Sequence, residues 1–337
     1  MDTLTHIVLG ACIGEVVAGK VLGKKALLLG AIGQSIPDVD FIPQLWLGTS
    51  DDLLAHRGFT HSILFGIIMT LVLSVISWKV YPTRPISRVR WLFLFSVNIF
   101  SHVFIDTFNS YGTGWFEPFN HNRFSFHVLY VADPLFSIGA FLGFVFLLIA
   151  ALTHKRRKWA AWLGISLSAV YLVYAFVNKL SVDEKLRKDL AGKNIPIERG
   201  SYILTPAPFN SWLWYTVIKD KNGFWVGYRS VFDHKPTSLI YFPQNDSLLH
   251  KVKDKDEVED LLRFAGDFYT VENSHDSLVF NVLRFGQVVG WYDPHEKFTF
   301  HYFLDKPGAN DLIVQRGRFE GWNRETFRSF INRIKGN

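Results

Sequence analysis

Two uncharged stretches of the chain are PLFSIGAFLGFVFLLIAALT (134–153) and WAAWLGISLSAVYLVYAFVN (159–178). A helix needs about 20 apolar residues to cross the hydrocarbon core of a membrane, and each stretch has that length. Only the basic segment HKRRK (154–158) separates them. Uncharged runs joined by a short basic connection predict a multi-pass helical membrane protein, and this pattern decides the fold class.

More apolar segments precede these two. Ser62–Trp78 is a third secure span, and Trp91–Ile105 is a shorter one with a histidine near its end. Leu4–Gly19 and Ala26–Pro37 are shorter still, rich in glycine and joined by a turn around Gly23, so we expect a helical hairpin that does not fully cross the bilayer. The sequence therefore predicts four to six transmembrane segments.

The second half of the chain has a different composition. Residues 1–178 hold nearly all the long uncharged runs, whereas residues 179–337 alternate apolar residues with frequent charges. We therefore expect a helical membrane domain (1–178) followed by a soluble α+β domain (179–337). Its predicted strands and helices are Trp212–Ile218, Phe224–Val231, Leu278–Leu283, Phe298–Leu304, Glu257–Phe264 and Arg324–Ile334, with a hairpin turn at Asn222-Gly223.

The positive charges indicate membrane topology and not nucleic-acid binding. The net charge is +6, but lysine and arginine cluster beside apolar runs, at Lys20–Lys25, Lys79–Arg90 and Lys155–Lys158. We expect these basic connections to be cytoplasmic and membrane lipids to be the immediate partners. The alternate loops, and the domain at 179–337, should then face the extracytoplasmic side. The single cysteine, Cys12, excludes an intramolecular disulfide framework.

Residues that can bind a metal collect at the ends of the predicted segments that lie opposite the basic connections. They stand where the first segment begins, the second ends, the third begins and the fourth ends. They are His6, Asp38, Asp40, His56, His61, His102 and Asp106. Ordinary topology does not require histidines and carboxylates to gather at one set of helix ends, so their sorting predicts a metal site.

The residue types and spacings agree with a divalent ion. Imidazole and carboxylate together bind zinc, which we favour, and also manganese or iron; more than four such groups could hold two ions. His102 and Asp106 are four apart, which places both on one face of a helix. We expect Asp38 and Asp40 to point the same way from an extended segment. We place His61 in a first helical turn capped by Thr60.

Other polar residues have open or structural interpretations. Asp2 and Asp133 lie at the same helix ends but are also good helix-start residues. Arg57 could bind a substrate anion or pair with Asp51 or Asp52. Surface or structural roles are expected for His121, His127 and His154. The sequence contains no HExxH metalloprotease helix, no Walker loop and no GxSxG elbow.

In these motifs the chain resembles the bacterial YdjM-like family of membrane-bound metal-dependent hydrolases. The matching stretches span about residues 1–135 and are MDTLTH (1–6), IPDVD (36–40), HRGFTHS (56–62), SHVFIDTFNSYG (101–112), Trp115, Pro118 and Asp133-Pro134. The resemblance implies a bacterial inner-membrane protein with a hydrolase-type metal site similar to that of zinc-dependent phospholipase C. It supports His6, Asp38, His56, His61, His102 and Asp106 as ligand candidates, with Asp40 next, and says little about residues 179–337.

The expected function is hydrolysis of a phospholipid or another phosphoester by water that the metal activates. We expect Asp40 or Asp106 to accept a proton and Arg57 to hold a phosphate oxygen. One alternative is a non-catalytic membrane protein in which the metal joins the helix ends and the outer domain binds a partner. A transporter is a third possibility, for which Glu15 is the main candidate inside a span. The sequence leaves the oligomeric state open.

Overall fold

The structure is a computed structural model that describes residues 1–42, 49–192, 200–274, 277–306, 310 and 321–336. It has two compact units, one made of Met1–Leu45 and Ala55–Tyr174, the other of Trp46–Leu54 and Ala175–Asn337. The first is helical and the second contains antiparallel sheets, so the fold class is a helical membrane region followed by an α+β region.

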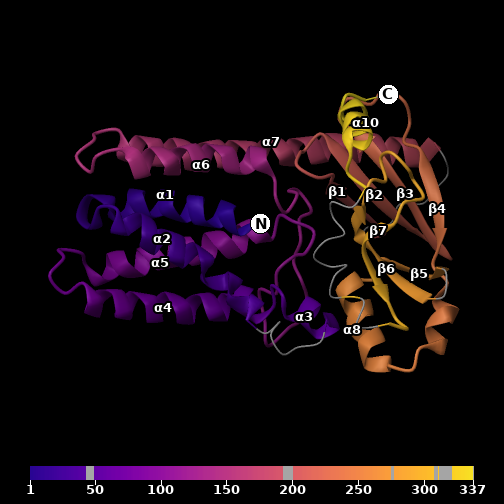
Figure 1. Ribbon diagram of the computed structural model, residues 1–337, viewed down its shortest axis with the longest axis horizontal. Helices are drawn as coiled ribbons and strands as arrows, with labels where there is room; N and C mark the ends of the chain where they lie inside the picture. Colours follow the sequence, from indigo (N-terminus) through magenta and orange to yellow (C-terminus); the bar gives the residue numbers. More distant parts are fainter. Residues whose placement is uncertain (43–48, 193–199, 275–276, 307–309, 311–320, 337) are drawn as a thin grey trace. The chain divides into compact units, whose positions relative to one another are not determined.

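The first unit consists of apolar helices that lie side by side (Figure 1). Four helices are long and apolar enough to cross a membrane, and a fifth is shorter. The four are α1 (Thr3–Leu22), α4 (Ile63–Val80), α5 (Arg88–Asp106) and α7 (Arg157–Gly192); the fifth is α6 (Pro134–Ile149). The helix at the first predicted segment is thus long enough to cross a membrane, which corrects our expectation of a short hairpin arm. Its partner α2 (Lys25–Ser35) is short, as expected.

Glycine allows α1 and α2 to pack very closely. A Cβ atom built on Gly30 would lie 2.1 Å from the carbonyl oxygen of Gly10, a distance that real Cβ atoms do not reach. Gly23 makes the turn between the two helices with a φ of 59°, a conformation that glycine adopts without strain. The close packing brings the end of α2 beside the start of α1, where several of the candidate ligands lie.

The apolar core of the helical unit consists of two clusters between its helices. Buried apolar side chains of α1, α2 and α5 form one cluster around Trp91, Leu94 and Phe95. A second cluster joins α1 and α2 to α6 and α7 through Cys12, Leu147 and Ala161. Cys12 is therefore a small buried core residue.

The second unit contains two antiparallel sheets and the continuation of α7 past Asn178, where the sequence predicts the domain boundary. One sheet has the order β1-β2-β3-β4 and the other β5-β6-β7. The strands are β1 (Tyr202–Pro206), β2 (Leu213–Asp220), β3 (Gly223–Ser230), β4 (Leu239–Pro243), β5 (Tyr269–Ser274), β6 (Ser277–Gln287) and β7 (Phe298–Phe303). The helices are α8 (Lys255–Ala265) and α10 (Arg324–Ile334), and α3 covers Thr49–Ala55.

The hairpin between β2 and β3 differs by one residue from its prediction. Asp220 pairs with Gly223, so Lys221 and Asn222 form the turn and Gly223 begins the next strand. Glycine is needed there because a Cβ atom would lie 2.3 Å from the carbonyl oxygen of Phe242. Glycine is therefore required here for the pairing of β3 with β4, and not for the turn that the Asn-Gly sequence predicted.

Candidate metal centre

Four side chains from three different elements meet at one end of the helical unit. Asp38 lies in the 3₁₀ helix η1 (Ile36–Phe41) after α2, and His61 ends the 3₁₀ helix η3 (Phe59–His61) before α4. His102 and Asp106 occupy the last turns of α5. One ligand atom from each of the four lies within 4.8 Å of the others, and His61, His102 and Asp106 are fully buried.

The distances within this four-residue cluster match those around a metal ion. The Nε2 atoms of His61 and His102 are 3.1 Å apart. Asp106 Oδ2 lies 3.4 Å from His61 Nε2 and 3.7 Å from His102 Nε2. Asp38 Oδ1 lies 3.4 Å from His102 Nε2 and 3.8 Å from His61 Nε2. A tetrahedral zinc ion with ligand distances of about 2.0–2.2 Å would separate its donor atoms by about 3.3–3.6 Å.

The protonation pattern also fits a ligand set. His102 Nδ1 lies 2.5 Å from the carbonyl oxygen of Gln34, which can only accept, so Nδ1 carries the proton and Nε2 presents a lone pair to the cluster. Burial lowers the pKa of His61 from 6.5 to about 4, which keeps its imidazole neutral at pH 7. Neutral imidazole is the form that binds metals. Two facing Nε2 atoms therefore lie beside carboxylates with room for a cation between them.

The carboxylates leave acceptor atoms unused. Asp38 Oδ2 and Asp106 Oδ2 are buried, and neither accepts a well-aligned hydrogen bond from the part of the chain that the structure describes. Buried acceptors without donors cost free energy unless a cation or water satisfies them, so the chemistry of the cluster fits a divalent ion.

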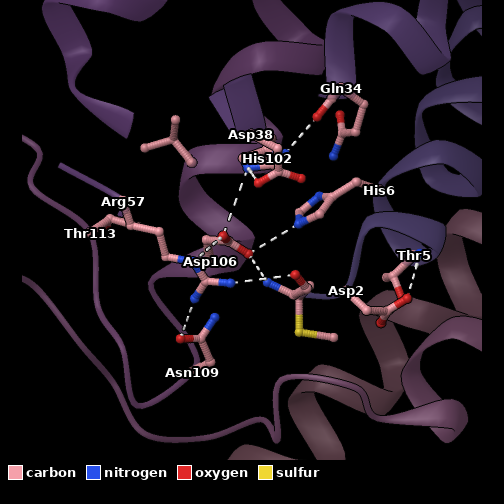
Figure 2. A network of polar contacts seen from close by, with 12 residues as sticks. Asp2, Thr5, His6, Gln34, Asp38, Arg57, His102, Asp106, Asn109 and Thr113 are labelled. Carbon is pink, nitrogen blue, oxygen red and sulfur yellow. Dashed lines mark hydrogen bonds and ion pairs between the residues drawn. The ribbon is translucent and has the colours of Figure 1, made fainter. Parts of the chain in front are cut away.

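Asp106 is also held from outside the cluster. Its Oδ1 lies 3.1 Å from His6 Nε2 and contacts the α-amino group of Met1, while Arg57 Nε lies 3.1 Å from Oδ2. Figure 2 shows Asp106 between His6 and Arg57. His6 stacks on His102 with ring centroids 3.7 Å apart. His6 is therefore not one of the four converging residues, but it contacts one of them, Asp106.

The guanidinium of Arg57 is buried and contacts three groups of the protein. Its guanidinium donates to Asn109 Oδ1 at 2.6 Å and to the carbonyl oxygen of Met1 at 3.4 Å, in addition to its contact with Asp106 (Figure 2). Its backbone has a φ of 58°, and its amide donates to Asp40 Oδ2 at 2.7 Å. From the sequence, Arg57 could bind a substrate anion or pair with Asp51 or Asp52. The side chain of Asp51 lies outside the described residues. The carboxylate that pairs with the Arg57 guanidinium is that of Asp106.

Asp40 and His56 form a separate pair. His56 Nδ1 lies 3.1 Å from Asp40 Oδ2, and Asp40 Oδ2 lies 3.7 Å from His61 Nδ1, on the side of that ring away from the cluster. Burial acts to raise the pKa of Asp40, but the hydrogen bond and charge of His56 hold it below the usual range. Asp40 and His56 therefore border the cluster without joining it.

The local backbone explains why Asp38 and Asp40 separate. We expected an extended segment, in which both would point the same way, but the segment is a 3₁₀ helix. With three residues per turn, side chains two positions apart point in different directions. His61 likewise ends a 3₁₀ turn, and the N-cap of α4 is Ser62, whose hydroxyl accepts from Phe65 N at 3.1 Å. The predicted cap at Thr60 was therefore two residues early.

The residues with open or structural interpretations lie outside the cluster. Asp2 and Asp133 are N-caps of α1 and α6, and Tyr171 donates to Asp133 Oδ2 at 2.8 Å. His121 pairs with Glu117 at 2.8 Å on the surface, His127 Nδ1 lies 3.3 Å from Ser110 Oγ, and His154 Nδ1 accepts from Arg156 N.

Glu15, the candidate residue for a transport path, is buried in an ion pair with Arg157. Arg157 donates from Nε and Nη2 to its two oxygens at 2.9 and 2.8 Å. Arg157 Nη1 donates further to the carbonyl oxygens of Leu147 and Ala150. This pair joins α1, α6 and α7 as a structural contact.

Sequence reasoning missed Gln34 and Asn109 as parts of the site. Gln34 fixes His102, and Asn109 fixes Arg57. Gln34 acts through its main-chain carbonyl oxygen, which a residue of any type would offer, so its side chain gave no signal of this role. Asn109 stands three residues after Asp106 in a polar loop, where nothing distinguishes it from its neighbours.

Comparison with known proteins places the helical half in a family. The family model described as "YdjM inner membrane protein" matches residues 1–182, which is more than half of the chain. The "Inner membrane protein YbcI" of Escherichia coli (strain K12) is 32% identical over 123 residues, 36% of this chain and 69% of that protein. No solved structure matches.

The second half also has a relative. The "Uncharacterized protein YfhP" of Bacillus subtilis (strain 168) is 25% identical over 279 residues, which are 79% of this chain and 80% of that protein. A match of this length cannot fit within residues 1–182, so it includes part of the α+β region.

Proposed function

The chain belongs to the YdjM inner membrane protein family, and from this premise we propose that it is a membrane-bound metal-dependent hydrolase. Asp38, His61, His102 and Asp106 would hold the ion, with zinc favoured because two imidazoles and two carboxylates suit it as ligands. The observation that carries the proposal is the convergence of these four donors, with the Nε2 atoms of the two histidines 3.1 Å apart.

A bound divalent ion would supply an activated water molecule and polarise the bond under attack. The protein orients the ligand atoms. Gln34 keeps the Nε2 lone pair of His102 toward the cluster, and Arg57 with His6 fixes both oxygens of Asp106. Asp38 is 21% exposed, whereas the other three are fully buried, so water and substrate would enter from the side of Asp38.

The surroundings favour a lipid or another amphiphilic phosphoester. Large apolar side chains are exposed in three segments that adjoin the cluster. They follow Asp40, lie within η3, and stand in the loop after α5; they are Phe41, Ile42, Phe59, Phe116 and Phe119. Exposed apolar groups beside the ends of membrane helices contact acyl chains, and a substrate that carries such chains would reach the ion from the same layer.

Metal analysis with a hydrolysis assay tests this function. We expect purified protein to hold a divalent ion that His61→Ala and Asp106→Ala lose, whereas His121→Ala, which changes a surface histidine, retains it. Metal-loaded wild type should cleave phosphodiester or phospholipid substrates, and chelation should abolish this activity. Unchanged metal content in both site variants would refute the site, and equal hydrolysis by stripped protein would refute the mechanism.

A second function has its own supporting observation. Four protein donors, three of them fully buried, also resemble a closed structural site, in which the ion joins η1, η3 and α5 without catalysis. The cobalt-substituted protein separates the two: added azide changes the visible spectrum of a site with an open position and leaves that of a closed site unchanged. A structural ion would also leave every ester intact.

We propose an extracytoplasmic position for the cluster, because the basic connections lie at the opposite ends of the same helices. Phe119 is 83% exposed in the loop after α5 and offers a reporter position. In intact cells, a membrane-impermeant maleimide should label Phe119→Cys but label Arg156→Cys only after permeabilisation. The reverse pattern would invert the proposed orientation.

A further inference from the structure

His56 and Asp40 form a histidine–carboxylate pair at the edge of the four-residue cluster. Asp40 is 4% exposed, whereas the side chain of His56 is 34% exposed. Their contact uses His56 Nδ1 and Asp40 Oδ2 at 3.1 Å. Among the residues that the structure describes, no hydrogen-bond partner occurs for His56 Nε2. The pair thus has one buried end and one free nitrogen on the accessible side.

The backbone around the pair holds it in place. The amide of Arg57 donates to the same Asp40 oxygen at 2.7 Å, and the carbonyl oxygen of Arg57 accepts from Gly114 N at 3.0 Å. The Arg57 guanidinium is tied to Asp106, a ligand candidate. The loop that carries His56 is therefore anchored to the cluster on both sides, so His56 has a defined position relative to it.

A second metal site is a poorer explanation of the pair. Besides Asp40 and His56, the nearest donor is His61 Nδ1, 3.7 Å from Asp40 Oδ2. The Asp40 oxygen already accepts the Arg57 amide, and within the described chain only the four-residue cluster brings three or more donor atoms within 4.8 Å of one another. A carboxylate that accepts the Nδ1 proton of a histidine orients that ring for proton transfer at Nε2.

We propose that His56 is a catalytic residue that donates its Nε2 proton to the leaving oxygen of the phosphoester, with Asp40 as its positioning residue. The inference rests on the hydrolase function proposed above. The oxygen of water bonds to phosphorus, and the bond from phosphorus to the alcohol oxygen breaks with its electron pair on that oxygen. His56 Nε2 gives that oxygen a proton and regains one from the attacking water. The products are an alcohol and a phosphate ester.

The leaving group provides the test. An alkoxide leaves only with a proton, whereas p-nitrophenolate leaves without one. His56→Gln should therefore lower kcat on a short-chain diacyl phosphatidylcholine by about 100-fold or more, within the usual range for general acids, and change kcat on bis(p-nitrophenyl) phosphate little. Asp40→Asn should also lower kcat on the phosphatidylcholine more than kcat on the p-nitrophenyl ester, but by a smaller factor. His121→Gln is the matched control, because it removes a surface histidine that also pairs with a carboxylate.

Two readouts do not depend on activity. Metal content should be the same in His56→Gln and wild type, and diethylpyrocarbonate should modify His56 equally in stripped and metal-loaded protein, because Nε2 binds no metal. Loss of metal in His56→Gln, protection of His56 by the metal, or equal activity losses on both esters would each overturn the proposal alone. Wild type that holds metal but cleaves neither ester would overturn the hydrolase function and this inference together.

Discussion

The helical unit contains two buried groups of charged residues, and they differ in how completely they are satisfied. In the pair of Glu15 and Arg157, both carboxylate oxygens and three guanidinium nitrogens have hydrogen-bond partners within the protein. In the four-residue cluster, two imidazole Nε2 atoms face each other and two carboxylate oxygens lack well-aligned donors in the described chain. The protein itself satisfies the charges of the pair, whereas the cluster needs a cation to satisfy its carboxylates.

This difference separates structural from functional burial of charge. A satisfied pair fixes the helices that carry it, and its loss affects folding. An unsatisfied set of donors persists only because the surrounding helices hold it, as expected for a binding site. The following predictions break or sharpen that distinction.

The largest effect on stability is expected from the complete pair. Glu15→Ala leaves Arg157 buried without its counter-charge, which costs about 3–5 kcal/mol of unfolding free energy in comparable buried pairs. Denaturant unfolding in detergent measures the loss, and Glu15→Gln should lose less because its amide keeps a hydrogen bond. Folded Glu15→Ala protein should hold as much metal as wild type. Metal loss in that variant would show that the two groups are coupled.

The open cluster should respond in the opposite way. His6→Ala removes the hydrogen bond to Asp106 Oδ1, and loss of such an outer partner lowers metal affinity by about 10–100-fold. Competition with a metal chelator measures this change, and stability without metal should alter little. His154→Ala, at the other end of the bundle, is the control and should bind normally. Complete loss of metal in His6→Ala would instead make His6 a direct ligand.

A backbone contact distant from the charges sharpens the comparison. Gly30→Ala places a Cβ atom 2.1 Å from the Gly10 carbonyl oxygen, which forces α1 and α2 apart and costs about 1–3 kcal/mol as overpacking does elsewhere. Because α2 leads into η1, Asp38 should move and metal affinity should fall in the same variant. Gly192→Ala has open space around its Cβ and should change neither property. Normal metal affinity in Gly30→Ala would show that α2 does not position Asp38.

The smallest effect concerns Asp133 and depends on pH. Burial raises the pKa of Asp133 from 3.8 to about 6, so the folded protein binds this proton more tightly than the unfolded chain. Its contribution to stability is present below pH 3.8 and is lost as the pH rises through about 6. Asp133→Asn should flatten the pH dependence of thermal unfolding in this window and leave metal content unchanged. An unchanged pH profile would contradict the raised pKa.

Sequence reasoning reached the spans because hydrophobicity and length nearly determine them. Trp91–Ile105 lies within α5, and Ser62–Trp78 lies within α4 except for its first residue, the N-cap. The family resemblance through MDTLTH and HRGFTHS is confirmed by the family match over residues 1–182. Boundaries that depend on local hydrogen bonds were less predictable. Ser62 caps α4 instead of Thr60, and η1 is a 3₁₀ helix where we expected extended chain.

The sequence by itself determined that this is a helical membrane protein with histidines and aspartates at one set of helix ends, because charge and hydrophobicity sort residues between lipid and water wherever the helices finally pack. Only the tertiary structure decided that Asp38, His61, His102 and Asp106 converge, that Arg57 faces Asp106, and that Asp40 pairs with His56. Those choices depend on the rotation of each helix and on the close contact of Gly10 with Gly30, which no spacing along one segment can specify.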